Sequence, residues 1–60
     1  MTTYIVHYQI DGVPQPAREM SLTAVSPLDR KREARDHISR RVTLFPGERI
    51  RIARMDVRHP

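Results

Sequence analysis

The helix signal in the middle of the chain constrains the fold more than any other feature. Ser26 is followed by Pro27 and, three positions after the serine, by Asp29. A serine side chain caps a helix N-terminus, proline fits the first helical position, and an acidic side chain there faces the positive end of the helix dipole. The sequence therefore predicts a helix over 27–42. It is the one helix that the chain indicates, so a helix-turn-helix is excluded.

The apolar side chains of this helix form a single narrow stripe, which the aliphatic stems of Lys31 and Arg35 widen. The stripe consists of Leu28, Ala34, Ile38 and Val42. A stripe of this width can cover one face of a small sheet. The helix should end before Pro46, which disfavours helix at Phe45, and Gly47 then frees the chain to turn.

Residues on both sides of the helix alternate between apolar and polar, which is typical of strands. The first strand is predicted over 3–11 and the second over 18–25. Between them an Asp-Gly pair and two prolines turn the chain, so we expect a hairpin with a loop of several residues. The third strand, over 49–57, changes parity between Ile52 and Ala53. Either it has two apolar faces or a β-bulge near these residues shifts the parity, and we favour the bulge.

These elements predict an α+β fold, a small single-layer ββαβ domain over residues 1–60. The crossover helix, with the right-handed connection that parallel pairing demands, gives a three-stranded sheet of order 2-1-3 with one helix packed on one face. If Tyr4, Val6 and Tyr8 face the helix, the other face stays open. This face, a possible surface for a partner or a homodimer, then carries Ile5, His7, Gln9, Ser21 and Thr23. In the inverted alternative, Tyr4 and Tyr8 form an exposed platform on which bases can stack.

No catalytic residue, metal site or cofactor is expected. The three histidines His7, His37 and His59 are far apart, and no acid is placed to orient any of them as a base. The two glycines lie in turns, so a phosphate-cradling loop is excluded. The chain has no cysteine, which favours a cytoplasmic location. Its first residues lack both a basic segment and an apolar run, so neither a signal peptide nor a membrane span is expected.

Basic charge is the chain's main functional signal. The net charge is +4, and ten of the eleven basic residues are arginine, whose planar fork suits phosphate and carboxylate groups. The predicted contact residues for a nucleic acid or an acidic partner are Arg30, Lys31, Arg35, Arg41, Arg49 and Arg51. The alternative is a solvated helix face held by ion pairs. The helical spacing allows Arg32 to pair with Asp36, Asp36 with Arg40, and Arg30 with Glu33.

The strings "YIVHYQIDG", "LTAVSPLDRKREARDHI" and "ERIRIARMDV" together resemble small accessory proteins of phages and prophages. That resemblance implies regulators or inhibitors of host machinery, such as anti-CRISPR proteins, in the host cytoplasm. We expect a non-enzymatic protein that binds the phosphate backbone of a nucleic acid. The alternative is a protein-binding module or inhibitor of a host protein. The rings of Tyr4, Tyr8 and Phe45 are expected in the core.

Overall fold

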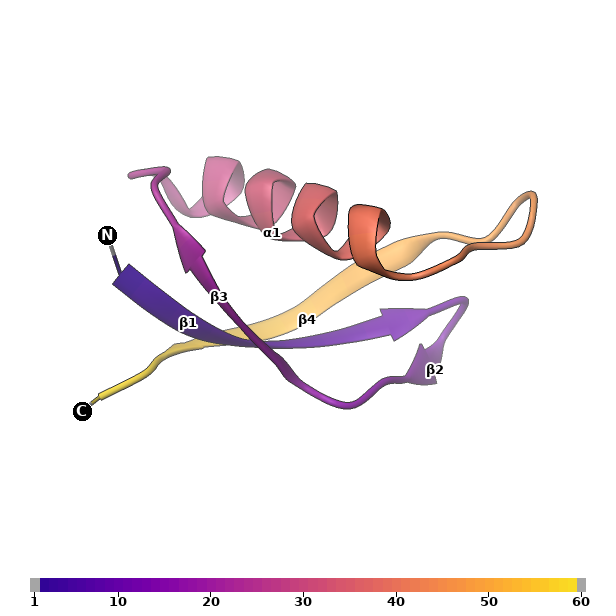
Figure 1. Ribbon diagram of the computed structural model, residues 1–60, viewed down its shortest axis with the longest axis horizontal. Coiled ribbons are helices and arrows are strands. Elements are labelled where there is room, and N and C mark those ends of the chain that lie inside the picture. The colour runs from indigo at the N-terminus through magenta and orange to yellow at the C-terminus, as the bar shows by residue number, and fades with distance from the viewer. Residues whose placement is uncertain (1, 60) are drawn as a thin grey trace.

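The fold is an open antiparallel sheet with one helix across one of its faces (Figure 1). The computed structural model describes residues 2–59. Met1 and Pro60 of the predicted domain lie outside the described residues. The predicted α+β class, with a single helix on one face, is confirmed.

Strand β1 (Thr2–Ile10) is the centre of the sheet. Strands β2 (Val13–Pro14) and β3 (Arg18–Leu22) pair along one edge of β1, and β4 (Ile50–Val57) pairs along the other. The predicted order 2-1-3 therefore corresponds to β3-β1-β4 and is confirmed. The expectation of parallel pairing was wrong, because all of these pairings are antiparallel. The crossover joins β3 and β4, which run in the same direction but have β1 between them.

The hairpin after β1 is tighter than predicted. Ile10 pairs directly with Val13, and the two residues between them both have positive φ, 49° at Asp11 and 79° at Gly12. This is the geometry of a two-residue type I′ turn, which an Asp-Gly pair favours. The pairing with β1 is then interrupted at residues 15–17 and resumes in β3. The returning chain has one more residue than β1 over this interruption. The loop of several residues is therefore an interruption within the returning strand.

A β-bulge in β4 is confirmed. His7 pairs with Arg54 and Tyr8 with Ile52, which leaves Ala53 without a partner on β1. The extra residue shifts the parity, so that Ile52 before the bulge and Met55 after it both lie against the core.

The helix α1 (Pro27–Arg41) begins and ends with satisfied backbone groups. Ser26 Oγ accepts a hydrogen bond of 3.1 Å from the Asp29 N–H, as the capping signal predicts. The predicted end at Val42 is one residue late, since Val42 is the C-cap and its N–H donates to the Ile38 carbonyl over 3.0 Å. The predicted strand 18–25 ends at Leu22, three residues early.

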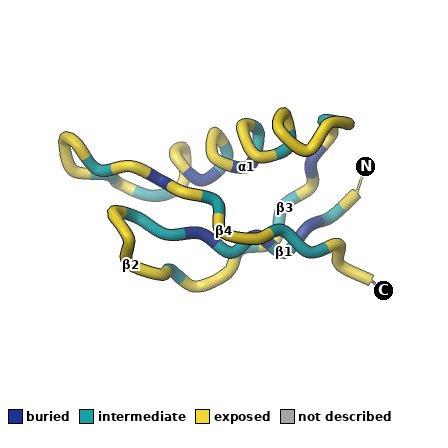
Figure 2. Tube along the Cα trace, turned by 180° about the vertical axis from the view of Figure 1, so that it is seen from behind, coloured by how far each residue is buried: buried dark blue, intermediate teal, exposed yellow. Residues whose placement is uncertain are grey.

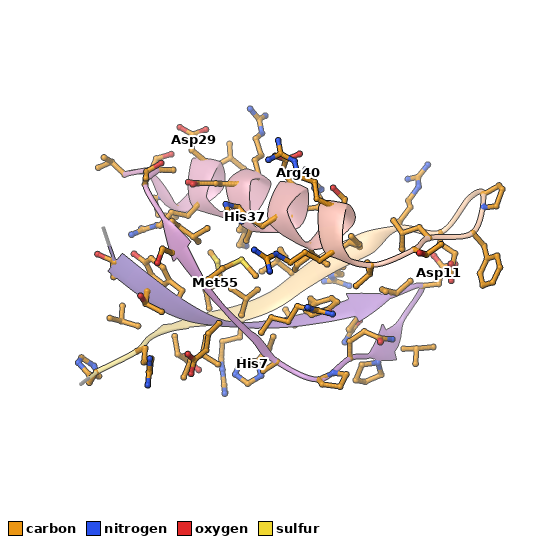
Figure 3. All side chains as sticks on the ribbon, in the orientation of Figure 1. His7, Asp11, Asp29, His37, Arg40 and Met55 are labelled. Atoms are coloured by element: carbon orange, nitrogen blue, oxygen red, sulfur yellow. The ribbon has the colours of Figure 1, made fainter. Side chains whose placement is uncertain are left out.

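The core lies between α1 and the helix-facing side of the sheet (Figure 2). Its buried members are Tyr4, Val6, Tyr8, Leu22, Ala34, Ile38 and Ile50. The preferred orientation of the sheet is therefore correct, and the exposed tyrosine platform is excluded. In Figure 3, Met55 lies between the helix and the sheet, whereas His7 lies on the opposite side of the sheet. Leu28 does not belong to the buried stripe, because 62% of its surface is exposed in the first turn of α1.

Candidate nucleic-acid interface

A groove runs between α1 and β4. It has a volume of about 380 Å³ and combines four basic side chains with aliphatic ones. Its lining residues are Leu28, Lys31, Arg32, Arg35, Ile50, Arg51 and Ile52. The helical members follow a spacing of three or four, which places them on one side of α1. Arg51 lies opposite Gln9 on the edge strand β4, and it also lines the groove.

A second hollow of about 300 Å³ continues the groove toward the α1–β4 loop. The two share Arg35 and Ile50, and the second adds Ser39, Leu44 and Arg49. We call the combined surface the basic groove. Its five cations are Lys31, Arg32, Arg35, Arg49 and Arg51, and its lining includes no acidic side chain.

None of these five cations takes part in an ion pair among residues 2–59. The arginines that do form ion pairs lie elsewhere: Arg40 bonds Asp36 over 2.9 Å on the solvent side of α1, and Arg54 and Arg58 bond acids on the sheet. The predicted pair between Asp36 and Arg40 is confirmed. The predicted pairs Arg32–Asp36 and Arg30–Glu33 are not among the ion pairs of residues 2–59. The basic charge on the groove side of α1 is therefore less neutralised than the sequence suggests.

Glu33 does not pair with Arg30, because its carboxylate holds the β3–α1 loop. It accepts hydrogen bonds from the backbone N–H groups of Thr23, at 3.0 and 3.1 Å, and of Ala24, at 2.9 Å. The Thr23 hydroxyl donates to it as well, at 3.2 Å. The bond from the Ala24 N–H is the largest cause that lowers the pKa of Glu33, since it stabilises the charged form. Thr23 was expected on the open face of the sheet, and this prediction was wrong because β3 ends before it.

Arg30, a predicted contact residue, is bound within the fold. Its Nη1 donates to the Tyr4 hydroxyl over 2.9 Å, and its guanidinium carbon lies 5.7 Å from the centre of the Tyr4 ring. Arg30 is half-buried, and this hydrogen bond and ring contact hold its guanidinium against the core tyrosine.

The six predicted contact residues therefore divide. Four of them, Lys31, Arg35, Arg49 and Arg51, meet in the basic groove. Arg41 lines a different pocket, over β3, together with His37 and Glu19. Arg32 was not predicted, although its position three residues before Arg35 is a signal that could have indicated it.

The open face of the sheet is covered by charged and polar pairs. Ile5 and His7 lie on it, and so do Gln9 and Ser21, as their parity predicts. Arg58 bonds Glu19 across it over 3.3 Å. Asp56 lies 3.0 Å from Arg54 and 3.5 Å from His7. Burying these pairs in a homodimer would remove their hydration, which makes the face a poor surface for self-association.

The aromatic side chains separate into two groups. Tyr4 and Tyr8 are 8% and 3% exposed, as predicted, and their hydroxyls accept hydrogen bonds from Arg30 and Arg18. The core position expected for Phe45 was wrong, because 74% of its surface is exposed. The chain turns at Phe45 to connect α1 with β4, which carries this ring away from the sheet.

Comparisons with protein-family models, with curated proteins and with solved structures found no match to this chain. Within the described part of the chain, His, Asp and Glu side chains form no group of three that could hold a metal ion. No helix over residues 2–59 has both the length and the apolar character needed to cross a membrane.

Proposed function

We propose that this protein is a non-enzymatic nucleic-acid-binding protein that contacts the phosphate backbone through the basic groove. The observation that supports this most directly is the convergence of five cations, from α1, from the end of the α1–β4 loop and from the start of β4, without an acid among them. Four of the five are arginines, which bind phosphate oxygens through paired N–H donors. A groove of one sign of charge also concentrates anionic ligands near it.

The number of cations in the basic groove sets the expected salt dependence of binding. If all five neutralise phosphates, the slope of log K against log salt is about −4.5 for duplex DNA and about −3.5 for a single strand. Raising the salt from 50 to 200 mM should then weaken binding by roughly 500-fold and roughly 100-fold respectively.

Fluorescence anisotropy across a salt series tests this proposal with labelled single-stranded and duplex DNA and RNA. The variant Arg35→Ala/Arg51→Ala removes two groove cations and should lower the magnitude of the slope by about 1.4 to 1.8. The matched control is Arg40→Ala/Arg54→Ala, which removes the same charge from residues paired elsewhere. Equal effects of the two variants, or no binding by the native protein at low salt, would contradict a specific role for the groove.

A second candidate is an acidic protein partner, and the exposed Leu28 in the groove favours it. A groove that combines an apolar residue with a basic rim fits a peptide carrying both apolar and acidic side chains. If the chain is phage-encoded, as the resemblance implies, that partner would be a host protein under inhibition. A single partner that binds in a salt-tolerant way would favour this candidate over the first. Since the chain has no cysteine, we propose a cytoplasmic location for either activity.

A further inference from the structure

We propose that the nucleic acid bound in the basic groove is single-stranded and that one of its bases stacks on the exposed ring of Phe45. This inference rests on the proposed function. It adds that the ligand is single-stranded and names the residue that contacts one of its bases. Phe45 is the one ring left for such a contact, because the structure buries Tyr4 and Tyr8.

The turn that carries Phe45 is held by hydrogen bonds between its first and last residues. The Glu48 N–H donates to the Phe45 carbonyl over 3.0 Å, and the Phe45 N–H donates to the Glu48 carboxylate over 2.6 Å. Pro46 occupies the second position of the turn, and Gly47 occupies the third with φ of 89°, the arrangement of a type II turn. The ring is thus 74% exposed on a closed turn, which lowers the entropy that it loses when a ligand covers it.

The same turn lies between two residues that line the basic groove. Leu44, immediately before it, and Arg49, immediately after it, both line the second hollow. Arg49 is held in turn by the β1–β2 hairpin, since its N–H donates to the Asp11 carboxylate and its carbonyl accepts from the Asp11 N–H, each over 3.0 Å. Figure 1 shows the α1–β4 loop at the same end of the molecule as that hairpin. The ring therefore lies one residue after Leu44 and four residues before Arg49, both of which line the groove.

Cations that follow a backbone, next to an exposed ring, are the combination that single-strand-binding proteins use. In a duplex both faces of nearly every base are stacked, so the ring has no base to contact. In a single strand an unstacked base is free to cover the ring while the neighbouring phosphates meet Arg35 and Arg49. At this end of the groove, the carboxylates of Asp11 and Glu48 accept hydrogen bonds from the backbone N–H groups of Arg49 and Phe45.

The test compares Phe45→Leu with the native protein on a labelled oligo-dT single strand and on a duplex of the same length. Loss of one stacked base should weaken single-strand binding by roughly 5- to 150-fold with an unchanged salt slope, and it should leave duplex binding unaltered. Phe45→Trp should retain the affinity, and the stacked base should quench its fluorescence. The signal reports on this position alone, because the chain has no other tryptophan. Val25→Ala is the control, since it trims an exposed apolar side chain in the β3–α1 loop. Circular dichroism establishes that each variant is folded.

The outcomes separate this inference from the proposal on which it rests. If Phe45→Leu binds the single strand like the native protein while Arg35→Ala/Arg51→Ala binds weakly, the stacking inference fails and the groove proposal stands. An equal loss on strand and duplex also overturns it, because the ring would then not read an unstacked base. Tighter binding of poly-glutamate than of the strand, lost in Phe45→Leu, would assign the ring to a protein partner instead. If no variant and no native protein binds nucleic acid at low salt, both proposals fail.

Discussion

Replacing Arg30 should lower stability without lowering nucleic-acid affinity, although its position in the basic helix suggests the opposite. Its guanidinium donates to the Tyr4 hydroxyl over 2.9 Å and lies 5.7 Å from the ring centre. A hydrogen bond from a charged donor contributes about 1.5 kcal/mol at the lower end of its range, and a partly exposed cation–π contact adds about 0.5 kcal/mol. Arg30→Ala should therefore lower the free energy of unfolding by about 2 kcal/mol.

Urea denaturation followed by circular dichroism measures this loss. A chain of this size has an m-value near the lower limit of about 1 kcal/mol per molar urea, so the midpoint should fall by about 2 M. Arg35→Ala provides the reverse case, because it lines the groove and forms no ion pair in the described chain. It should leave the midpoint within about 0.5 M and weaken nucleic-acid binding instead.

A double-mutant cycle with Tyr4→Phe isolates the contact between Arg30 and Tyr4. Tyr4→Phe keeps the ring and removes the hydroxyl that accepts the hydrogen bond. Since both single changes remove the same hydrogen bond, their combination should destabilise by at least about 0.5 kcal/mol less than the sum. Additive losses, or an Arg30→Ala variant that is fully stable but binds nucleic acid weakly, would refute this account and return Arg30 to the ligand contacts.

Other positions give further tests. Ile38→Ala removes a fully buried side chain and should cost about 3 kcal/mol, close to the whole stability of a domain this small, so circular dichroism should show a largely unfolded chain. Glu33 has a lowered pKa in the fold, so its contribution is present above its ordinary pKa of about 4.3 and is lost as the pH falls through the folded value. The urea midpoint of Glu33→Gln should therefore be lower than that of the native protein at pH 7, and it should fall less as the pH is lowered. Gly12→Ala places a side chain at φ of 79° and should cost about 1 kcal/mol by the same assay.

Local sequence signals predicted the backbone well. The cap at Ser26 was visible because capping depends on residues within one turn of each other. The bulge at Ala53 was visible because a change of parity within one strand has few explanations. The tight turn at Asp11 and Gly12 was missed because the prolines that follow suggested a longer loop, although an Asp-Gly pair is itself a signal for a two-residue turn.

The candidate site was predicted only in part, because it depends on contacts between elements. Whether an arginine on α1 faces β4 or β3 is set by how the helix lies on the sheet, which no local pattern encodes. Thus Arg35 and Arg41, both predicted as contacts, line different pockets. Glu33 could not be assigned from its helical spacing, because it is bound by a loop about ten residues away. Phe45 was expected in the core from its position in the chain, which does not show that a turn can hold a ring in solvent.

The central position of β1 has a consequence for the way this protein is made. β1 is synthesised first among the strands, yet one of its two edges is completed only by β4, about forty residues later. At about 5–20 residues per second, a ribosome leaves that edge open for roughly 2–8 s. During this interval the apolar row of β1 and the backbone groups along that edge have no partner strand. Pairing of β4 is therefore the last step that completes the sheet.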